Sequence, residues 1–290
     1  METLFSIHIN EITCTRCGRC VAVCPSHIFQ QEKPRNPIDI QHPQNCISCG
    51  HCVAACPTES VIHTSFPPEK VHPIDRQLLP TAEQVMALCR ARRSNRAFSD
   101  KPVPREALEQ IVEAAHRAPT ASNMQKVSFT VVTDPEMLRR ITNLTLDVYG
   151  ELIRLLENPL LRPILKHVVK QGYRYLPTFH RLVKAQAEGT DLILRGAKAL
   201  LLIHTPADVR FGKADANLAY ENGSLMAESL GVSQFYTGFI CSAFDNDRKG
   251  RFQKLLGIEG QKLQAGMALG MPAFRFARYI DKKPADIKWI

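Results

Sequence analysis

Apolar residues recur along the chain with helical and strand-like periods that alternate after residue 80. The segment PREALEQIVEAAHRAP places apolar residues on one face of a helix, namely Leu108, Ile111, Val112 and Ala115, and Pro119 ends it. The run VSFTVVT is instead rich in β-branched residues, which favour strands. We therefore expect an α+β layered sandwich. The expected strands are 127–133, 199–205 and 262–270, and the expected helices begin after Thr81 or span 104–119, 135–157, 178–188 and 213–230.

A proline-rich stretch divides the chain. Residues 63–80 contain four prolines and no periodic apolar pattern, which predicts a linker or a segment that wraps over the surface. We expect a small domain at residues 1–62 and a larger one at 81–290.

Residues 147–190 of the larger domain are helical in pattern and match no motif. Two interpretations remain open: an inserted cap over a site, and an amphipathic helix on a membrane surface. The basic residues that support the membrane interpretation are Arg154, Arg162, Lys166 and Lys170. The prolines expected to interrupt these helices, and so to favour the cap, are Pro159, Pro163 and Pro177.

Composition and charge exclude some classes of function. With 44% apolar and 22% charged residues, the chain has an ordinary globular composition. The net charge of +9 comes from the larger domain, where the basic residues are scattered, so we expect a solvated surface and no nucleic-acid partner. No apolar stretch approaches the roughly 20 residues of a membrane span, and the first ten residues resemble no signal peptide. We expect a cytoplasmic protein without a membrane partner.

Eight of the ten cysteines lie in two matching runs, CTRCGRCVAVCP at 14–25 and CISCGHCVAACP at 46–57. Each run reads C-x2-C-x2-C-x3-C-P, the spacing of bacterial ferredoxins that bind two iron–sulfur clusters. Zinc sites usually split their ligands into two distant pairs, and disulfides do not persist in a reducing cytoplasm. The spacing therefore predicts two [4Fe–4S] clusters, and roughly residues 5–62 resemble the two-[4Fe–4S] ferredoxin family.

In this spacing the fourth cysteine of each run binds the other cluster. One cluster is expected on Cys14, Cys17, Cys20 and Cys56, and the other on Cys46, Cys49, Cys52 and Cys24. The glycines Gly18 and Gly50 let the backbone turn closely around the metal. Because about 60 residues bury too little apolar surface to fold alone, the metal is expected to supply part of the folding energy.

Four further residues invite other chemistry. His27 and His51 lie beside the cysteine runs, but the eight cysteines already supply all the expected ligands. Cys89 and Cys241 stand alone in apolar surroundings, where we expect them to be buried small hydrophobic residues and not nucleophiles.

The larger domain lacks the glycine-rich motifs of Rossmann and P-loop nucleotide sites. It instead contains ARRSNRAF at 91–98, AAHRAPTASNMQ at 114–125, YENGSLMAESLGV with YTGF between 220 and 239, and LGMPAFRFAR at 269–278. A serine flanked by arginines suits a phosphate, although a helix end with exposed charge gives the same pattern. In this order and spacing the four segments resemble the FMN-dependent nitroreductase family, over roughly residues 82–275 without 147–190.

The resemblance implies a three-layer α/β/α sandwich, preceded here by the ferredoxin-like domain, and a set of residues that hold FMN. The arginine–serine segment would hold the flavin phosphate and ring edge, the second segment would lie along the ring, and a turn would lie near N5. A late basic residue would bind the phosphate, and Arg275 and Arg278 both remain open. The implied FMN-binding residues are Arg92, Arg93, Ser94, Arg96, Pro119, Thr120, Ser122, Asn123, Gln125, Thr237 and Gly238, with Arg275 or Arg278.

The resemblance also implies an intertwined homodimer with flavin at the interface. Small residues recur on one face of the segment 215–230, which suits close approach of two helices in a dimer, while ordinary packing within one chain is the alternative. These residues are Ala216, Ala219, Gly223 and Ala227. One departure from the family is Lys126-Val127, where family members often have Pro-Trp, so one wall of the site is expected to differ.

Together the two domains predict an oxidoreductase in which two [4Fe–4S] clusters relay electrons to FMN. The flavin would reduce a nitroaromatic, a quinone or a similar conjugated acceptor, with electrons from ferredoxin, flavodoxin or NAD(P)H. The alternative is an electron carrier or redox sensor that turns over no small molecule. An open pocket at the flavin favours the enzyme, and a ring covered by residues 147–190 favours the carrier. No side chain is assigned as a catalytic acid or base.

Overall fold

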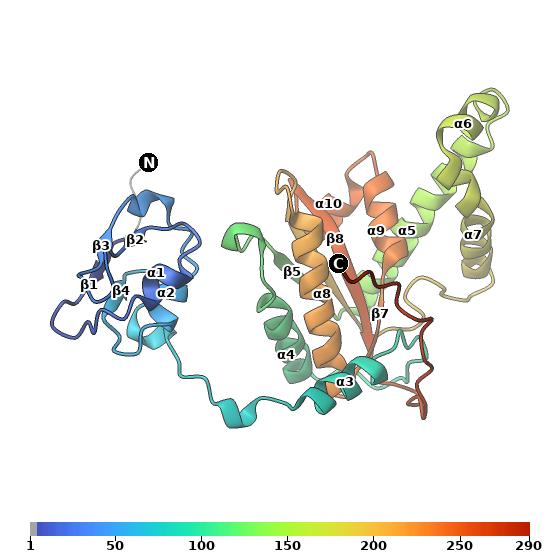
Figure 1. Ribbon diagram of the computed structural model, residues 1–290. Coiled ribbons are helices and arrows are strands. Elements are labelled where there is room, and N and C mark those ends of the chain that lie inside the picture. The colour runs from blue at the N-terminus through green and yellow to red at the C-terminus, as the bar shows by residue number, and fades with distance from the viewer. Residues whose placement is uncertain (1–4) are drawn as a thin grey trace. The chain divides into compact units, whose positions relative to one another are not determined.

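The computed structural model describes residues 5–290, which form two units (Figure 1). The first four residues of the expected small domain lie outside this range. The first unit extends to Pro80 and also takes in the short segment Ala121–Met124. The second unit comprises Thr81–Thr120 and Gln125–Ile290.

Two small antiparallel sheets and two short helices build the first unit. β1 (Ile7–Ile9) pairs with β4 (Val61–His63), and β2 (Phe29–Gln30) pairs with β3 (Asp39–Ile40). Each helix carries the third cysteine of its run: Cys20 in α1 (Arg19–Val23) and Cys52 in α2 (His51–Ala54). Short 3₁₀ turns complete the unit at Pro43–Asn45, Pro68–Lys70, Arg76–Leu78 and Ala121–Asn123.

The backbone of the two cysteine runs follows the same path. Gly18 and Gly50 precede α1 and α2 with the same φ of 73°, a left-handed conformation that glycine adopts readily. Arg16 and Ser48, between the first two cysteines of each run, also have positive φ values of 52° and 50°. The repeat in the sequence is thus a repeat in the structure.

A four-stranded antiparallel sheet lies at the centre of the second unit, with strand order β5-β6-β8-β7. The central strands β6 and β8 come from the apolar runs at 199–205 and 262–270, as the sequence predicts. The strands are β5 (Ser128–Val132), β6 (Ala199–Pro206), β7 (Ser233–Tyr236) and β8 (Gln261–Gly270).

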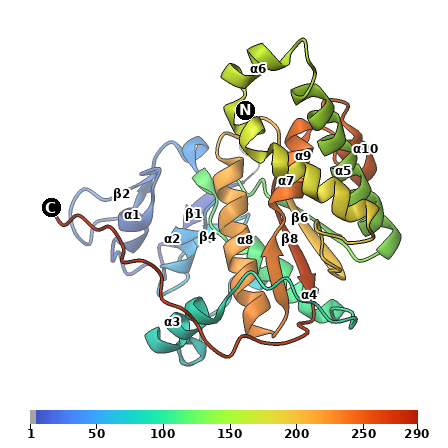
Figure 2. The ribbon, with the colours of Figure 1, turned by 90° about the vertical axis from the view of Figure 1, so that its right-hand side faces the viewer.

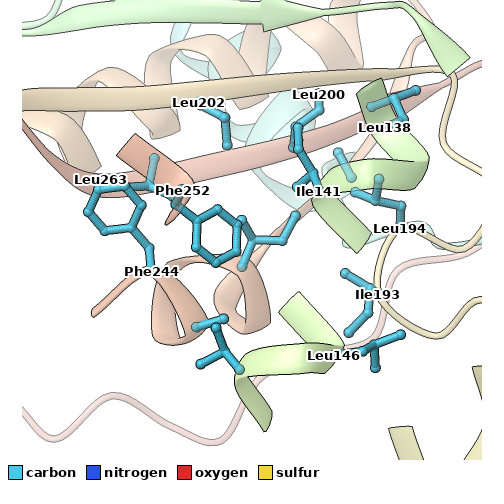
Figure 3. Packing of buried hydrophobic residues seen from close by; sticks show 14 of the residues in the cluster. Leu138, Ile141, Leu146, Ile193, Leu194, Leu200, Leu202, Phe244, Phe252 and Leu263 are labelled. Carbon is cyan, nitrogen blue, oxygen red and sulfur yellow. The ribbon is translucent and has the colours of Figure 1, made fainter. Parts of the chain in front are cut away.

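Helices cover both faces of this sheet (Figures 1 and 2). Alternate residues of β6 point to opposite cores: Leu200 and Leu202 to one, Leu201 and Ile203 to the other. The first core is completed by α5 (Pro135–Leu156), α7 (Lys170–Ala187), α9 (Gly238–Asn246) and α10 (Arg251–Leu256), and the second by α4 (Arg105–His116) and α8 (Gly212–Ser229). Figure 3 shows the first core, in which Leu200 and Leu202 pack with Ile141 and Phe252. The expected three-layer sandwich is confirmed.

The expected helix after Thr81 is α3 (Ala82–Ala91). The Thr81 side chain accepts a hydrogen bond from the Gln84 amide, and the Gln84 side chain accepts one from the Thr81 amide, which is a capping box.

The helical region 147–190 differs from its sequence-based outline. Residue 147 lies inside α5, and the helix expected at 178–188 begins earlier, at Lys170. Pro177 lies within α7 and does not interrupt it, while Pro163 lies in the first turn of α6 (Arg162–Val168), where a missing amide proton costs nothing.

The small residues of α8 suggested close approach of two helices in a dimer, but the structure shows that this face packs within the chain. Ala216, Ala219 and Ala227 are buried within the chain, and a side chain at Gly223 would meet Ala115 and Ile111 of α4. The alternative interpretation, packing inside one chain, is therefore correct for this face.

The two isolated cysteines behave differently from each other. Cys89 is exposed on α3, so its expected burial is wrong. Cys241 on α9 is partly buried, and desolvation raises the pKa of its thiol to about 12. Among the described residues, no helix has the length and apolar character required to span a membrane.

Candidate functional site

The structure groups the cysteines across the two runs. Burial raises the pKa of the Cys20 thiol, and Cys14 and Cys56 lie near enough to contribute to the rise. Cys56 belongs to the other run, so the structure brings the fourth cysteine of the second run near two cysteines of the first.

The second set shows the same crossing. Burial raises the pKa of the Cys52 thiol to about 11, with smaller contributions from Cys46, Cys49 and Cys24. Metal coordination deprotonates thiols that burial alone would keep protonated. Cys17, the remaining member of the first set, is exposed.

Backbone amides point at the cysteine sulfurs in both runs. The Arg16 amide donates to Cys14 Sγ at 3.4 Å, and the Ser48 amide donates to Cys46 Sγ at 3.3 Å. The Ser60 amide donates to Cys56 Sγ at 3.1 Å. Such amides stabilise negative charge on thiolates and on the clusters that they bind.

Within residues 5–290, no group of three or more His, Cys, Asp or Glu side chains is close enough to hold a single metal ion. In a cubane each of the four thiolates binds a different iron, so the sulfurs surround the cluster and need not converge on one ion. The crossed sets, the sulfur-directed amides and the thiol donors therefore fit cubane clusters.

Sequence reasoning missed one side chain beside these sulfurs. His63, at the end of β4, is buried, and its Nε2 lies 3.7 Å from Cys46 Sγ. Burial lowers the pKa of this imidazole, which favours the neutral ring. The histidines closer in sequence to the runs, His27 and His51, show no contact of this kind with a described sulfur.

In the second unit, a buried asparagine fixes the arginine-rich segment 92–96. Asn95 donates from Nδ2 to Ser233 Oγ at 2.9 Å and to the Phe274 carbonyl at 3.2 Å. Its Oδ1 accepts from the Ala97 amide at 3.0 Å. Sequence reasoning missed Asn95, and the available signal was an uncharged amide between the arginines.

Further contacts hold this segment beside β7. Ser94 forms a parallel bridge with Gln234, whose Nε2 donates to the Arg93 carbonyl at 3.5 Å. Arg92 forms an ion pair with Glu221 of α8 at 3.5 Å. The backbone of residues 92–96 is therefore anchored to two elements of the second unit.

A cavity of about 470 Å³ opens beside this segment in the second unit. Its size lies within the range of pockets that hold small molecules and cofactors. Three of the expected FMN-binding residues line it: Arg96, Thr237 and Gly238. The guanidinium of Arg96 lies 5.4 Å from the centre of the Phe235 ring, a cation–π contact. The other lining residues are Tyr149, Tyr175, Phe179, Leu192, Ile193, Arg195, Tyr236, Phe239 and Ser242.

The helical region 147–190 supplies one wall of this cavity. Tyr175 and Phe179 come from α7, and Phe179 stacks on Tyr149 with ring centres 4.4 Å apart. Tyr149 donates its hydroxyl to the Phe239 carbonyl at 2.7 Å, and burial raises its pKa, so the phenol stays protonated. This placement agrees with the cap interpretation of the region.

A second guanidinium, that of Arg195, lies at the cavity on a loop fixed by Asp191. The Asp191 carboxylate accepts from the amides of Ile193 and Leu194 at 2.8 and 2.9 Å. Arg195 itself has a positive φ of 55°. The lining includes the guanidinium groups of Arg96 and Arg195 but no carboxylate, which favours negatively charged ligands.

Several expected site residues do not line this cavity. Pro119, Thr120 and Gln125 are absent from its wall, and Thr120 Oγ1 accepts from the Gln125 amide at 3.0 Å. Ser122 and Asn123 belong to the first unit. There the Asn123 side-chain amide donates to the carbonyls of Ile47 and Ser48, at 3.2 and 2.8 Å.

The two late arginines differ in position. The guanidinium of Arg275 lies against Gly231, in the turn between α8 and β7. Its neighbour Phe274 is held by Asn95, so Arg275 lies beside the anchored arginine segment. Arg278 is exposed.

Comparisons with known proteins place these features in families. Residues 89–271 match the model of the nitroreductase family, and residues 6–57 match the model of a 4Fe-4S dicluster domain. An NADPH-dependent oxidoreductase from Staphylococcus saprophyticus is 25% identical over 197 residues, which are 66% of this chain and 66% of that protein. The chain thus spans slightly less than two thirds of that relative.

Solved structures share the fold of the second unit. A nitroreductase with bound FMN from Bacteroides fragilis has a TM-score of 0.54 at 22% identity, covering 71% of this chain and 98% of that one. A nitroreductase with bound FMN from Desulfitobacterium hafniense also has a TM-score of 0.54, at 20% identity over 72% of this chain and all of that one. At these identities the likeness concerns the fold. Because the family model covers more than half of the chain, the protein belongs to the nitroreductase family, with a 4Fe-4S dicluster domain on the N-terminal side.

Proposed function

We propose that this protein is an FMN-dependent oxidoreductase in which two [4Fe–4S] clusters relay electrons to the flavin, which then reduces a conjugated organic acceptor. The clusters are assigned to the crossed cysteine sets, Cys14, Cys17, Cys20 and Cys56 for one and Cys46, Cys49, Cys52 and Cys24 for the other. FMN is assigned to the cavity in the second unit. The observation that carries the flavin assignment is the convergence of Arg96, Thr237 and Gly238 on that cavity.

The chain's residues would hold the cofactor by charge and by packing. The anchored segment 92–96 presents guanidinium groups suited to a phosphate. Of the two late arginines, Arg275 is the better candidate for the phosphate, because it lies beside this segment through Phe274 and Asn95. The aromatic wall of Tyr149, Phe179 and Phe235 suits a planar ring.

Bound FMN accepts electrons singly and passes them on as a pair, which suits it to join a one-electron donor to an organic acceptor. Attaching the clusters and the flavin to one chain raises their effective concentration toward each other. An external ferredoxin or flavodoxin would supply electrons to the clusters, and NAD(P)H is the alternative electron donor.

The cavity also bears on the choice between an enzyme and a carrier. An accessible cavity at the proposed flavin site is the feature expected of an enzyme. Tyr175 and Phe179 of the helical region line this cavity but do not fill it. This supports small-molecule turnover. The positive charge of Arg195 favours acceptors that carry a carboxylate or a phosphate.

The absence of Pro119, Thr120 and Gln125, all residues of the second unit, from the wall of this cavity supports a homodimer. The family resemblance implies that flavin lies at a subunit interface. These residues would then complete the flavin site of a second copy of the chain. The dimer proposal rests on this division of the expected site and not on α8.

Anaerobic stopped-flow absorbance tests the relay. Reduced ferredoxin or flavodoxin is mixed with the holoprotein, and bleaching of the flavin is followed in the unsubstituted protein and in Cys24→Ala and Cys56→Ala. Both variants are expected to slow bleaching by at least tenfold with these donors. Direct reduction by NAD(P)H, if it occurs, is expected to keep its rate.

Cys89→Ala is the matched control, since Cys89 is an exposed cysteine outside both runs. It is expected to leave bleaching unchanged. Unaltered bleaching in Cys24→Ala and Cys56→Ala would contradict the relay, and a protein that binds no FMN after reconstitution would contradict the flavin assignment.

A further inference from the structure

The imidazole of His63 is held rigidly beside one cysteine sulfur. His63 is buried, stacks on Phe5 with ring centres 4.8 Å apart, and contacts the Phe66 ring at 4.9 Å. Its Nε2 lies 3.7 Å from Cys46 Sγ. Hydrogen bonds to sulfur are longer than those to oxygen because sulfur is larger, so this separation is a bonding one.

A second hydrogen bond fixes which nitrogen of this ring carries the proton. The Ser65 amide donates to His63 Nδ1 at 3.1 Å, so Nδ1 presents a lone pair. In the neutral ring the proton then lies on Nε2, which faces Cys46. His63 is therefore a donor to the sulfur and not an acceptor from it.

The first cysteine run has no equivalent donor at the matching position. Gln31 precedes His63 by the same number of residues by which Cys14 precedes Cys46. Its Nε2 donates to the carbonyls of Arg16 and Asn36, at 3.1 and 2.8 Å, and not to Cys14. Cys14 and Cys46 otherwise match, each accepting from the amide two residues later. The imidazole thus distinguishes two otherwise similar sulfurs.

We propose that the His63 Nε2–H donates a hydrogen bond to the Cys46 thiolate and raises the reduction potential of the cluster that Cys46 binds. Reduction adds negative charge to a cluster and its thiolates, and a hydrogen-bond donor stabilises the more negative form. The inference rests on the proposed cluster assignment and extends it: His63 is a positioning and tuning residue that makes the two clusters unequal.

Redox titration of the full-length holoprotein followed by EPR tests this inference. His63→Phe keeps a planar ring between Phe5 and Phe66 but removes the donor. One of the two cluster potentials is expected to fall, so that at a fixed potential the oxidised-to-reduced ratio of that cluster rises about tenfold, or about 59 mV for a one-electron couple. The other potential is expected to stay. His63→Gln, which retains an N–H donor, is expected to recover part of the loss.

His51→Phe is the matched control, because it makes the same substitution beside Cys52, at an exposed residue. It is expected to change neither potential. Two unshifted potentials in His63→Phe, or an equal shift of both, would overturn the inference while leaving the clusters in place. A wild-type protein without iron after reconstitution would instead overturn the cluster assignment itself.

A measurement on the unsubstituted protein covers the case in which His63→Phe fails to hold its clusters. Pulsed EPR of the reduced protein, with the histidine nitrogens isotopically labelled, is expected to detect a histidine nitrogen coupled to a cluster. The coupling is expected to persist in His51→Phe. If no such coupling is seen, the hydrogen bond is absent and the inference is wrong.

Discussion

The two units bury their interiors in different ways. Among the described residues of the first unit, the buried hydrophobic core consists of Cys20, Ile28, Phe29, Cys52 and Val61, and two of these are cysteines of the proposed clusters. The second unit has a hydrophobic core on each face of a sheet, with Leu200, Leu201, Leu202 and Ile203 all fully buried. From this comparison we expect that apolar burial stabilises the second unit and that the proposed metal ligation completes the first.

Size leads to the same distinction. A segment of some 60 residues buries a small fraction of its surface, and structural metals supply folding free energy in such cases. Burial of Cys20 and Cys52 also raises the pKa of each thiol, so without metal these side chains stay protonated in the interior. We therefore expect the two units to respond oppositely to metal removal and to cavity-forming substitutions.

Removal of iron is expected to have the largest effect and is the strongest way to break the comparison. Anaerobic chelation of the full-length protein is expected to abolish the fixed structure of residues 5–80 while the second unit remains folded. Limited proteolysis with mass spectrometry is expected to show rapid cleavage throughout 5–80 and protection of the sheet strands. The double variant Cys20→Ala, Cys52→Ala is expected to behave in the same way.

Cys89→Ala is again the control, and it is expected to keep full iron content and full protection. If residues 5–80 stayed protected in the iron-free protein, the first unit would fold by its own packing and the comparison would be wrong. Loss of the second unit at the same time would show that the two units do not fold separately.

A cavity in the second unit is expected to have an intermediate effect. Leu202 is fully buried in the centre of β6 and packs in the core shown in Figure 3. Leu202→Ala is expected to lower the free energy of unfolding of this unit by about 3 to 4 kcal/mol, through lost burial and the cavity that remains. Urea denaturation followed by circular dichroism measures the change.

Iron content and the two cluster potentials are expected to stay unchanged in Leu202→Ala. Leu218→Ala is the matched control, since Leu218 lies on α8 with 47% of its surface exposed. It is expected to cost less than about 0.5 kcal/mol. Equal costs for the two leucines would contradict the assignment of the core.

The elements that the sequence predicted are those with strong local signals. The cysteine runs specify their turns through spacing and the two glycines, and both runs take the same backbone path. The apolar runs of β6 and β8 identified the centre of the sheet. Thr81 indicated the start of α3, where the structure shows a capping box with Gln84.

What the sequence did not reveal depends on contacts between distant residues. β7 has four residues and includes the polar Gln234, which pairs with segment 92–96, so it has no clear strand period. Pro177 is tolerated inside α7, against the local rule. The small face of α8 looked suited to a partner because the sequence does not show that α4 covers it. His63 looked like part of a linker, although β4 brings it beside Cys46.

The expected FMN-binding residues were predicted only in part, because some have local motifs and others depend on contacts between distant residues. The motifs predicted a set of residues around a flavin, and three of them line the cavity of the second unit. Two residues hold the loops of this cavity. Asn95 bonds to Ser233 Oγ and the Phe274 carbonyl, which are far from it in sequence, and Asp191 accepts from backbone amides two and three residues later. Such supporting residues carry no motif of their own.

The smallest expected effect concerns the rim of the cavity and sharpens the comparison at the level of chemistry. The first unit is proposed to bind its clusters through eight cysteines, whereas the second unit is expected to recognise its acceptor through an exposed charge. Arg195 is exposed, has a left-handed backbone and is placed by Asp191.

Arg195→Asn removes the charge but keeps a residue that tolerates this backbone conformation. We expect KM for a carboxylate-bearing quinone or nitroaromatic to rise about two- to fivefold, as is usual for exposed charge pairs, with kcat unchanged. An uncharged acceptor of the same ring system is expected to show no change, and Arg195→Lys is expected to recover most of the loss. Arg210→Asn, which removes an exposed arginine just before α8, serves as the control for net charge. Equal effects on charged and uncharged acceptors would mean that Arg195 shapes the cavity or holds the cofactor and does not select the acceptor by charge.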